Sequence, residues 1–296
     1  MRKSFIVFAF FLTLLAARPA AASGDSLEST LNQKYKKQSY SLRHAVISDS
    51  QHFDSSGKLL GDSLEGPWTV YGRLSINKIK LKPGKLIIEG QRIGYLFDKR
   101  QRKLTPYKLD ESTKLEIVLD QPLPSAEEAD KLLGRIFAFS KEDFLASVSS
   151  LWRPYLESQV EVYSDDGRNL QFKEHPDQKK RLLKAPAQPK DVQQQEKAQG
   201  GIYRVGNGVK APVFIFTPDP DYNDIARKAK LQATNVFDMV IDESGKVAGL
   251  QLVQPAGLGL DENSVIKLRT WNFHPAMRDD RPVKVLVTVE VSFNLY

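Results

Sequence analysis

Ser63, Asp49 and His52 are the residues of this sequence whose types could do hydrolytic chemistry. A serine hydroxyl becomes a nucleophile when a histidine takes its proton and a carboxylate orients that histidine. Ser63 lies in the string Gly-Asp-Ser-Leu at 61–64, and Asp49 and His52 precede it. The same string also occurs at 24–27, and a triad is defined by geometry, not by four letters. The pattern favours a polar turn between strands, and a Ser63 hydrolase is the least favoured of three functional hypotheses.

The histidines do not have the spacing of a metal site. The sequence has no cysteine, and no two histidines are four residues apart, as two ligands on one helix face would be. A glycine-rich phosphate loop is also absent. We therefore predict no catalytic residue, no metal and no cofactor. The four histidines are His44, His52, His175 and His274.

The stretch "TWNFHPAM" at 270–277 concentrates aromatic residues just before a charged turn. Trp271, Phe273 and Pro275 are the types that close a hydrophobic core where a helix meets a sheet. We predict that they are structural core. The alternatives are an aromatic ligand pocket or a metal corner at His274.

Composition points to an exported protein of about two domains. The chain has 296 residues and a formal charge of +7. Arg2, Lys3 and Arg18 contribute three of these charges within residues 1–22, which leaves about +4 for the rest. That balance is too mild to indicate nucleic acid. Without cysteine the fold has no disulfide, so packed cores must stabilise it.

Residues 1–22 read as a signal peptide. Two basic residues precede the apolar run Phe5–Ala17, which is shorter than the roughly 20 residues of a spanning helix. Ala20 and Ala22 then form a small-residue cleavage pattern. We expect a periplasmic protein, with an uncleaved inner-membrane anchor as the alternative.

Residues 27–173 predict a β-rich domain of unknown role. "WTVYGRLSI" from Trp68 alternates apolar and polar residues, a hairpin turn is expected at Pro83-Gly84, and 114–120 is another strand. Ser125 and Ser140 are predicted to cap two helices that follow the β-meander. The basic runs at 99–103 and 179–184 are solvated tips or contacts with anionic lipid or lipopolysaccharide. Residues 174–200 have the composition of a polar linker.

Residues 201–296 predict a second domain with the order α-β-β-α-β. A helix is expected near 222–229, a hairpin over 237–253, and a second helix capped by Asp261. The last strand alternates from Val283 to Leu295, so its odd-numbered side chains, including Val285, Val287 and Val289, are predicted to face the core. The whole chain is therefore expected to be α+β, with a β-meander and two helices first and a small antiparallel sheet with two helices second.

Several segments of this second domain resemble the TonB C-terminal domain family. They are "DYNDIARKAK", "VFDMVIDESGKVAGLQLV", "AGLGLDENSVIKLRTWNFHPAM" and "RPVKVLVTVEVSF". The resemblance covers about 205–296, and Tyr222 followed by Asn223 departs from the Tyr-Pro of the family. It implies a periplasmic module that docks outer-membrane transporters by pairing a sheet edge with a short peptide.

An exposed strand edge has unpaired N–H and C=O groups that an extended peptide can satisfy. We predict that the terminal strand is this edge, with partner-binding residues Lys284, Leu286, Thr288, Glu290 and Ser292. The apolar run near the N-terminus lacks the histidine that such energy transducers carry in their membrane helix, so we expect docking without direct energy coupling. The alternative is a cell-envelope structural protein whose first domain binds glycan or lipid.

Overall fold

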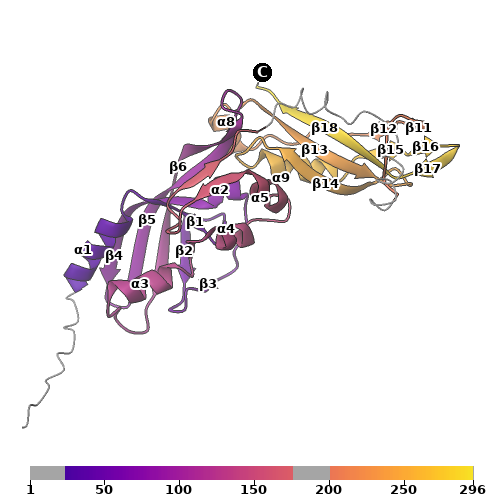
Figure 1. Cartoon of the computed structure of the whole chain (residues 1–296). Helices are drawn as coiled ribbons and strands as arrows, with labels where there is room; N and C mark the ends of the chain where they lie inside the picture. Colours follow the sequence, from indigo (N-terminus) through magenta and orange to yellow (C-terminus); the bar gives the residue numbers. More distant parts are fainter. Residues whose placement is uncertain (1–23, 176–200, 296) are drawn as a thin grey trace, which may run out of the picture.

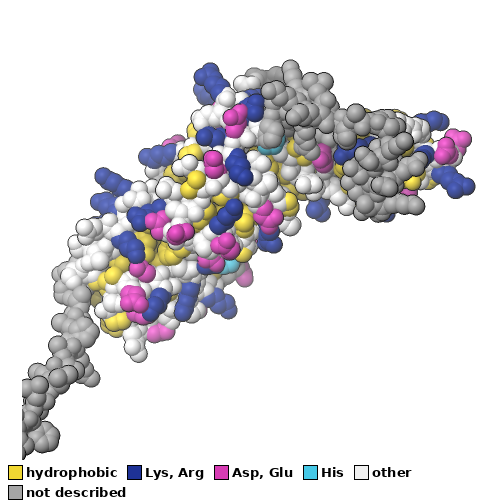
Figure 2. All heavy atoms as spheres, in the orientation of Figure 1, with side chains coloured by type: hydrophobic (Ala, Val, Ile, Leu, Met, Phe, Trp, Pro, Cys, Tyr) yellow, Lys and Arg dark blue, Asp and Glu magenta, His cyan; other side chains and the backbone are white. Residues whose placement is uncertain are grey.

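The computed structural model describes residues 24–175 and 201–295 (Figure 1). The signal peptide or anchor expected at 1–22, the basic run at 179–184 and nearly all of the expected linker lie outside these residues. Within the described ranges, no helix has the length and apolar character needed to cross a membrane. The fold is α+β, with an N-terminal and a C-terminal sheet at the two ends of an elongated molecule (Figure 1). On the side seen in Figure 2, charged side chains of both signs are interspersed.

The N-terminal sheet has seven strands in the order β3-β2-β6-β5-β4-β1-β7. Its centre is the expected meander, with turns at Pro83-Gly84 and at 99–102. The rest differs from a meander, because β2 pairs in parallel with β6 and β1 inserts between β4 and β7. The strands are β1 (Ser39–Leu42), β2 (Ser50–Phe53), β3 (Leu59–Leu60), β4 (Arg73–Lys82), β5 (Lys85–Asp98), β6 (Lys103–Val118) and β7 (Phe137–Ala138).

The prediction of a strand from Trp68 is wrong for its first four residues. Trp68–Tyr71 form the short helix α2, and β4 begins only at Arg73. Pro67 precedes the helical turn, and the N–H of Gly72 closes it by donating to the carbonyl of Trp68 at 2.9 Å. Trp68 and Val70 are both buried in this turn, so their apolar spacing mimics a strand.

Two helices cover one face of the N-terminal sheet. Leu27 and Leu31 of α1 (Gly24–Tyr35) and Leu133 of α3 (Ala126–Leu133) pack in one core with the inward side chains of β4, β5 and β6. The Ser125 hydroxyl accepts the N–H of Glu128, so the predicted cap is present.

The second capped helix is shorter than expected. Ser140 accepts the N–H of Asp143 and begins α4 (Lys141–Ser147), but the chain breaks and restarts as α5 (Arg153–Gln159). An unexpected hairpin of β8 (Val160–Tyr163) and β9 (Leu170–Phe172) follows.

The C-terminal sheet has the order β10-β18-β13-β14. The predicted sequence of elements is present as α8-β13-β14-α9-β18, with short strands added around it. The main elements are β10 (Tyr203–Arg204), α8 (Asp224–Lys228), β13 (Ala233–Ile241), β14 (Val247–Gln254), α9 (Leu260–Leu268) and β18 (Val285–Phe293). The small sheets are made of β11 (Val209–Lys210), β16 (Ala276–Arg278) and β17 (Arg281–Val283), and of β12 (Val213–Phe216) and β15 (Asn272–His274).

The loop before α9 joins the two sheets through backbone hydrogen bonds. Phe97 donates its N–H to the carbonyl of Ala256 at 2.9 Å, and Leu258 donates to the carbonyl of Tyr95 at 2.9 Å. The loop thus pairs with the end of β5 that extends beyond β4, whose pairing with β5 stops at Arg92. One apolar core, with Trp68 and Trp152 from one side and Phe237 from the other, continues through the junction. The division of the chain at 174–200 stays a prediction.

Asp261 holds this loop in shape and does not cap α9 as predicted. Gly259, at a positive φ of 79°, is the N-cap. The buried carboxylate of Asp261 instead accepts the N–H groups of Ala256 and Gly257 at 2.8 and 2.7 Å and the side-chain amide of Asn235 at 3.1 Å. Three donors satisfy a carboxylate that would otherwise be costly to bury.

Glu262 forms a side-chain bond across the junction. Its Oε1 accepts the indole N–H of Trp152 at 2.7 Å, whereas Oε2 is enclosed without a hydrogen-bond partner in the described structure. Burial raises the pKa of Glu262 to about 7, with a contribution from the charge of Asp261. Burial also raises the pKa of Asp261 to about 6, against the effect of its hydrogen bonds. Those bonds favour the ionised form of Asp261, so Glu262 holds a proton more strongly than Asp261 does.

Gly257→Ala tests the loop that joins the two sheets. Gly257 has a φ of +89°, and an added Cβ would overlap the carbonyl oxygen of Tyr95 and lie 2.6 Å from the Cα of Leu96. Gly208 is a matched control, because its φ is +86° and an added Cβ would meet nothing within 4 Å. We expect Gly257→Ala to lower the free energy of unfolding by about 2 kcal/mol more than Gly208→Ala does, measured by urea denaturation. Equal losses would contradict the close packing of the junction.

Glu262→Gln tests the protonated carboxyl at the junction. A carboxyl whose pKa is raised on folding stabilises the fold below its unfolded pKa, near 4.5, and loses this effect as the pH rises through about 7. The free energy of unfolding should therefore fall by a few kcal/mol between about pH 5 and pH 8, at about 1.4 kcal/mol per pKa unit. The glutamine variant should weaken this dependence and leave the part that the raised pKa of Asp261 contributes below about pH 6, and the exposed Glu157→Gln should leave it unchanged. The same slope in Glu262→Gln would exclude this carboxyl as its source.

Candidate functional site

The outer edge of β18 is the candidate site that the sequence predicted. On one side β18 pairs antiparallel with the whole of β13, from Val285 opposite Ile241 to Phe293 opposite Ala233. On the other side β10 pairs in parallel with Val285 and Leu286 only. Beyond Leu286, no strand of the described residues pairs with this edge. We call the edge from Val287 to Phe293 the β18 rim.

The direction of the backbone groups on the β18 rim follows from one hydrogen bond. Tyr203 of β10 donates its N–H to the carbonyl of Lys284 at 2.9 Å, so the backbone of Lys284 points away from β13. Backbone groups alternate between the two sides of a strand, and both groups of one residue point the same way. The even-numbered residues therefore direct their N–H and C=O groups outward. β10 covers the start of this edge, and the uncovered groups are those of Thr288, Glu290 and Ser292.

The side chains of β18 form a mixed apolar and polar pattern. Val285, Val291 and Phe293 are buried, whereas Val287 and Val289 are half-buried. Among the predicted partner-binding residues, Lys284 and Leu286 are half-buried and the other three are exposed. Thr288 donates its hydroxyl to Asp238 at 2.8 Å, and Ser292 bonds to the Thr234 hydroxyl at 3.1 Å.

The aromatic corner at 270–277 packs around a strand that the sequence analysis missed. Phe273 is buried, while Trp271 and Pro275 are half-buried. The indole of Trp271 donates to the carbonyl of Pro218 at 3.0 Å. Phe214 of β12 contacts both aromatic rings, with centroids 6.1 Å from Trp271 and 5.2 Å from Phe273.

β12 is a second exposed strand with an apolar surface. It pairs with β15 on one side, and all four of its side chains are more than half exposed, at 59, 64, 53 and 58% for Val213, Phe214, Ile215 and Phe216. Such contiguous apolar exposure marks interaction surfaces. The run "VFIF" between Pro212 and Pro218 was the available signal, but four apolar residues without alternation do not show which side is exposed.

The residues of the hydrolase and metal hypotheses are not brought together. Ser63 is exposed, and no hydrogen bond among the described residues joins it to Asp49 or His52. The Nε2 of His52 instead lies 3.4 Å from the Ser50 hydroxyl. His274 is exposed on β15, and the described residues contain no group of three or more His, Asp or Glu side chains that could hold a metal ion.

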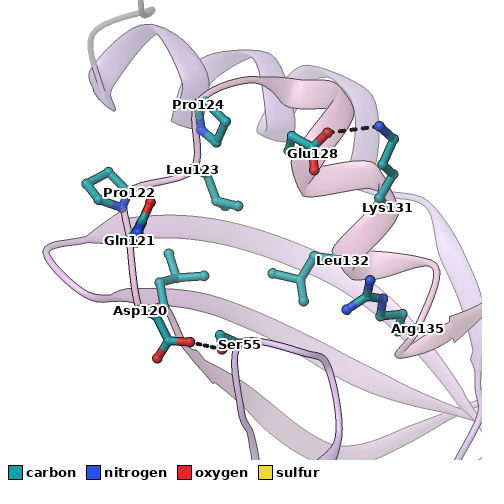
Figure 3. A pocket seen from close by; sticks show the side chains of 11 residues that line it. Ser55, Asp120, Gln121, Pro122, Leu123, Pro124, Glu128, Lys131, Leu132 and Arg135 are labelled. Atoms are coloured by element: carbon teal, nitrogen blue, oxygen red, sulfur yellow. Dashed lines mark hydrogen bonds and ion pairs between the residues drawn. The ribbon is translucent and has the colours of Figure 1, made fainter.

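A pocket of about 560 Å³ lies between α3, the turn at Ser55 and the loop that follows β6 (Figure 3). Most of its charged side chains and Ser55 bond to one another or to the nearby backbone. Asp120 accepts from Ser55, Lys131 pairs with Glu128 at 2.8 Å, and Arg135 donates to the carbonyl of Ser56 at 2.9 Å. These mutual bonds leave few groups to orient a ligand, so we assign the pocket no role.

Comparisons with known proteins concern the C-terminal part of the chain. The family model described as "Gram-negative bacterial TonB protein C-terminal" matches residues 218–295, which run from just before α8 to the end of β18. A search of solved structures gives the solution NMR structure of the Pseudomonas aeruginosa TonB CTD, at 15% identity and a TM-score of 0.25, covering 31% of this chain and 90% of that one. No curated protein matches the chain. On the strength of the family model, residues 218–295 are a TonB C-terminal domain.

Proposed function

We propose that this protein is a periplasmic adaptor that docks an outer-membrane transporter, or another envelope protein, by strand addition to the β18 rim. The TonB C-terminal domain supports a role in TonB-related transport. The observation that carries the proposal is that no described strand pairs with the outer backbone of Thr288, Glu290 and Ser292, while the inner edge is fully paired. An extended peptide that lies along these residues satisfies donors and acceptors that have no backbone partner among the described residues.

The polar surface of the β18 rim indicates what such a peptide would look like. Glu290 is exposed and has no ion-pair partner among the described residues, so a basic side chain opposite it in the added strand is favourable. The uncovered stretch is short, so backbone bonds at three residues give modest affinity. A weak, reversible contact suits a transporter that must be engaged and released.

The junction between the sheets supports an adaptor over a freely tethered module. Val291 and Phe293 of β18 belong to the core that also contains Trp68 and Trp152. A partner bound at the rim is therefore held at a fixed position relative to the N-terminal sheet. The alternative of a structural or glycan- and lipid-binding envelope protein is favoured only if the N-terminal sheet binds a partner by itself.

Glu290→Pro tests docking at the rim. Proline lacks the N–H, and at this position the missing N–H points outward, so the bonds from β18 to β13 are retained. We expect the chain to remain folded while the amount of outer-membrane transporter that co-purifies from envelope extract falls at least about tenfold, as for the loss of a bond worth about 1.4 kcal/mol. Mass spectrometry identifies the transporter, and circular dichroism checks the fold.

Glu290→Ala is the matched control, because it removes the same side chain and keeps the N–H. It should retain the transporter to within a few-fold if backbone pairing carries the contact. Equal loss in both variants would assign the contact to the carboxylate. Full retention in Glu290→Pro with loss in a Phe214→Ser, Phe216→Ser double variant would instead place docking on β12.

A further inference from the structure

One face of the N-terminal sheet carries a cluster of lysines that the proposed docking does not use. Inward side chains of β4, β5 and β6, such as Leu86, Ile88 and Leu115, pack beneath α1 and α3. Because side chains alternate along a strand, the residues between them point to the opposite face. The strand register places Lys78 beside Glu89 and Lys114, and Lys80 beside Ile87 and Glu116. The third row pairs Lys82 with Lys85 and Val118.

These rows leave the face strongly basic. Five lysines stand against two glutamates, a net charge of +3 on three adjacent strands. We call this surface the lysine face, defined by Lys78, Lys80, Lys82, Lys85 and Lys114.

The two glutamates are already occupied. Glu89 pairs with Lys80 at 2.5 Å, and Glu116 pairs with Lys85 at 2.5 Å and with Lys114 at 2.8 Å. Hydrogen bonds from Lys114 and Lys85 lower the pKa of Glu116 to about 2, so it is charged at any physiological pH. Lys78 and Lys82 are exposed, and neither has an acidic partner among the described residues. Two cations are therefore free to bind an anion.

Exposed apolar side chains lie on the same face. Val118 is 42% exposed and is paired with Lys85 in the register. Leu60 of β3 is 43% exposed. It pairs with His52 of β2, which pairs in turn with Glu116, so Leu60 lies in the same row as Lys80 and Ile87. Ile87, at the centre, is buried to 6% exposure between Lys80 and Glu116. Basic and apolar side chains that point the same way from a sheet suit a surface with anionic headgroups over a hydrocarbon layer.

We propose that the lysine face binds an anionic phospholipid surface and so holds the protein at a membrane. Lys78 and Lys82 supply most of the attraction to the headgroup phosphates, within a face whose net charge is +3, and Val118 and Leu60 lie where they contact the interface. A soluble polyanion would use the lysines and gain nothing from the two apolar side chains, which is why we favour a bilayer. The proposal is independent of docking at the β18 rim.

Vesicle flotation of the full chain tests the proposal. Vesicles of phosphatidylcholine with about one-third phosphatidylglycerol should carry the protein upward, and pure phosphatidylcholine should not. Binding should weaken as salt is raised. Lys78→Gln with Lys82→Gln should weaken binding about 25-fold, from a factor of about five for each lysine. Both lysines lack acidic partners, so the fold is expected to persist, and circular dichroism checks it.

Two matched variants make the result specific. Lys36→Gln with Lys228→Gln removes the same charge from exposed positions elsewhere and should change binding less than about threefold. Lys99→Gln with Lys103→Gln alters the tip between β5 and β6 instead. The proposal is overturned if the tip variant loses binding while the Lys78 and Lys82 variant keeps it, or if the Lys36 and Lys228 variant loses as much. It is also overturned if inorganic polyphosphate binds the chain and the anionic vesicles do not.

Discussion

The loop from Ala256 to Gly259 connects the two sheets by pairing its backbone with β5. It adds its backbone to the end of β5 and brings the start of α9 against Thr69, whose hydroxyl accepts the N–H of Gly259 at 3.0 Å. Pairing with β5 restricts the backbone conformation of the loop. Asp261 restricts it further by accepting the N–H groups of Ala256 and Gly257. Because of this junction the TonB C-terminal domain shares one apolar core with side chains of the first sheet.

The consequence for function is that two surfaces are held at fixed positions on one body. The β18 rim belongs to the C-terminal sheet, and the lysine face belongs to the N-terminal sheet. The two proposals together describe a spacer of defined length, with a membrane at one end and a strand-donating partner at the other. The raised pKa values of Glu262 and Asp261 predict that the contact between the two sheets weakens as the pH rises, since ionising both carboxyls in a buried site is unfavourable.

Local patterns predicted the elements, and long-range pairing decided their roles. The hairpin of β13 and β14 could be predicted from the alternation of apolar and polar residues and from its turn sequence. In that turn Asp242 accepts the N–H groups of Ser244 and Lys246. The caps at Ser125 and Ser140 were readable for the same reason, because donor and acceptor are three residues apart. Asp261 has the same local signature as a cap. Its true partners are set by the loop that docks on β5, and no local pattern encodes that contact.

The candidate edge shows the same limit. Alternation predicted which side chains of the last strand face inward, but only the bond from Tyr203 to Lys284 shows which backbone groups remain uncovered. The direct measurement is amide hydrogen exchange along β18 by NMR. In the free protein, the amides of Val287, Val289 and Val291 should exchange slowly and those of Thr288, Glu290 and Ser292 quickly. A synthetic peptide from the periplasmic end of the captured transporter should slow the second set. Uniform slow exchange in the free protein would show that the edge is already covered and would contradict the docking account.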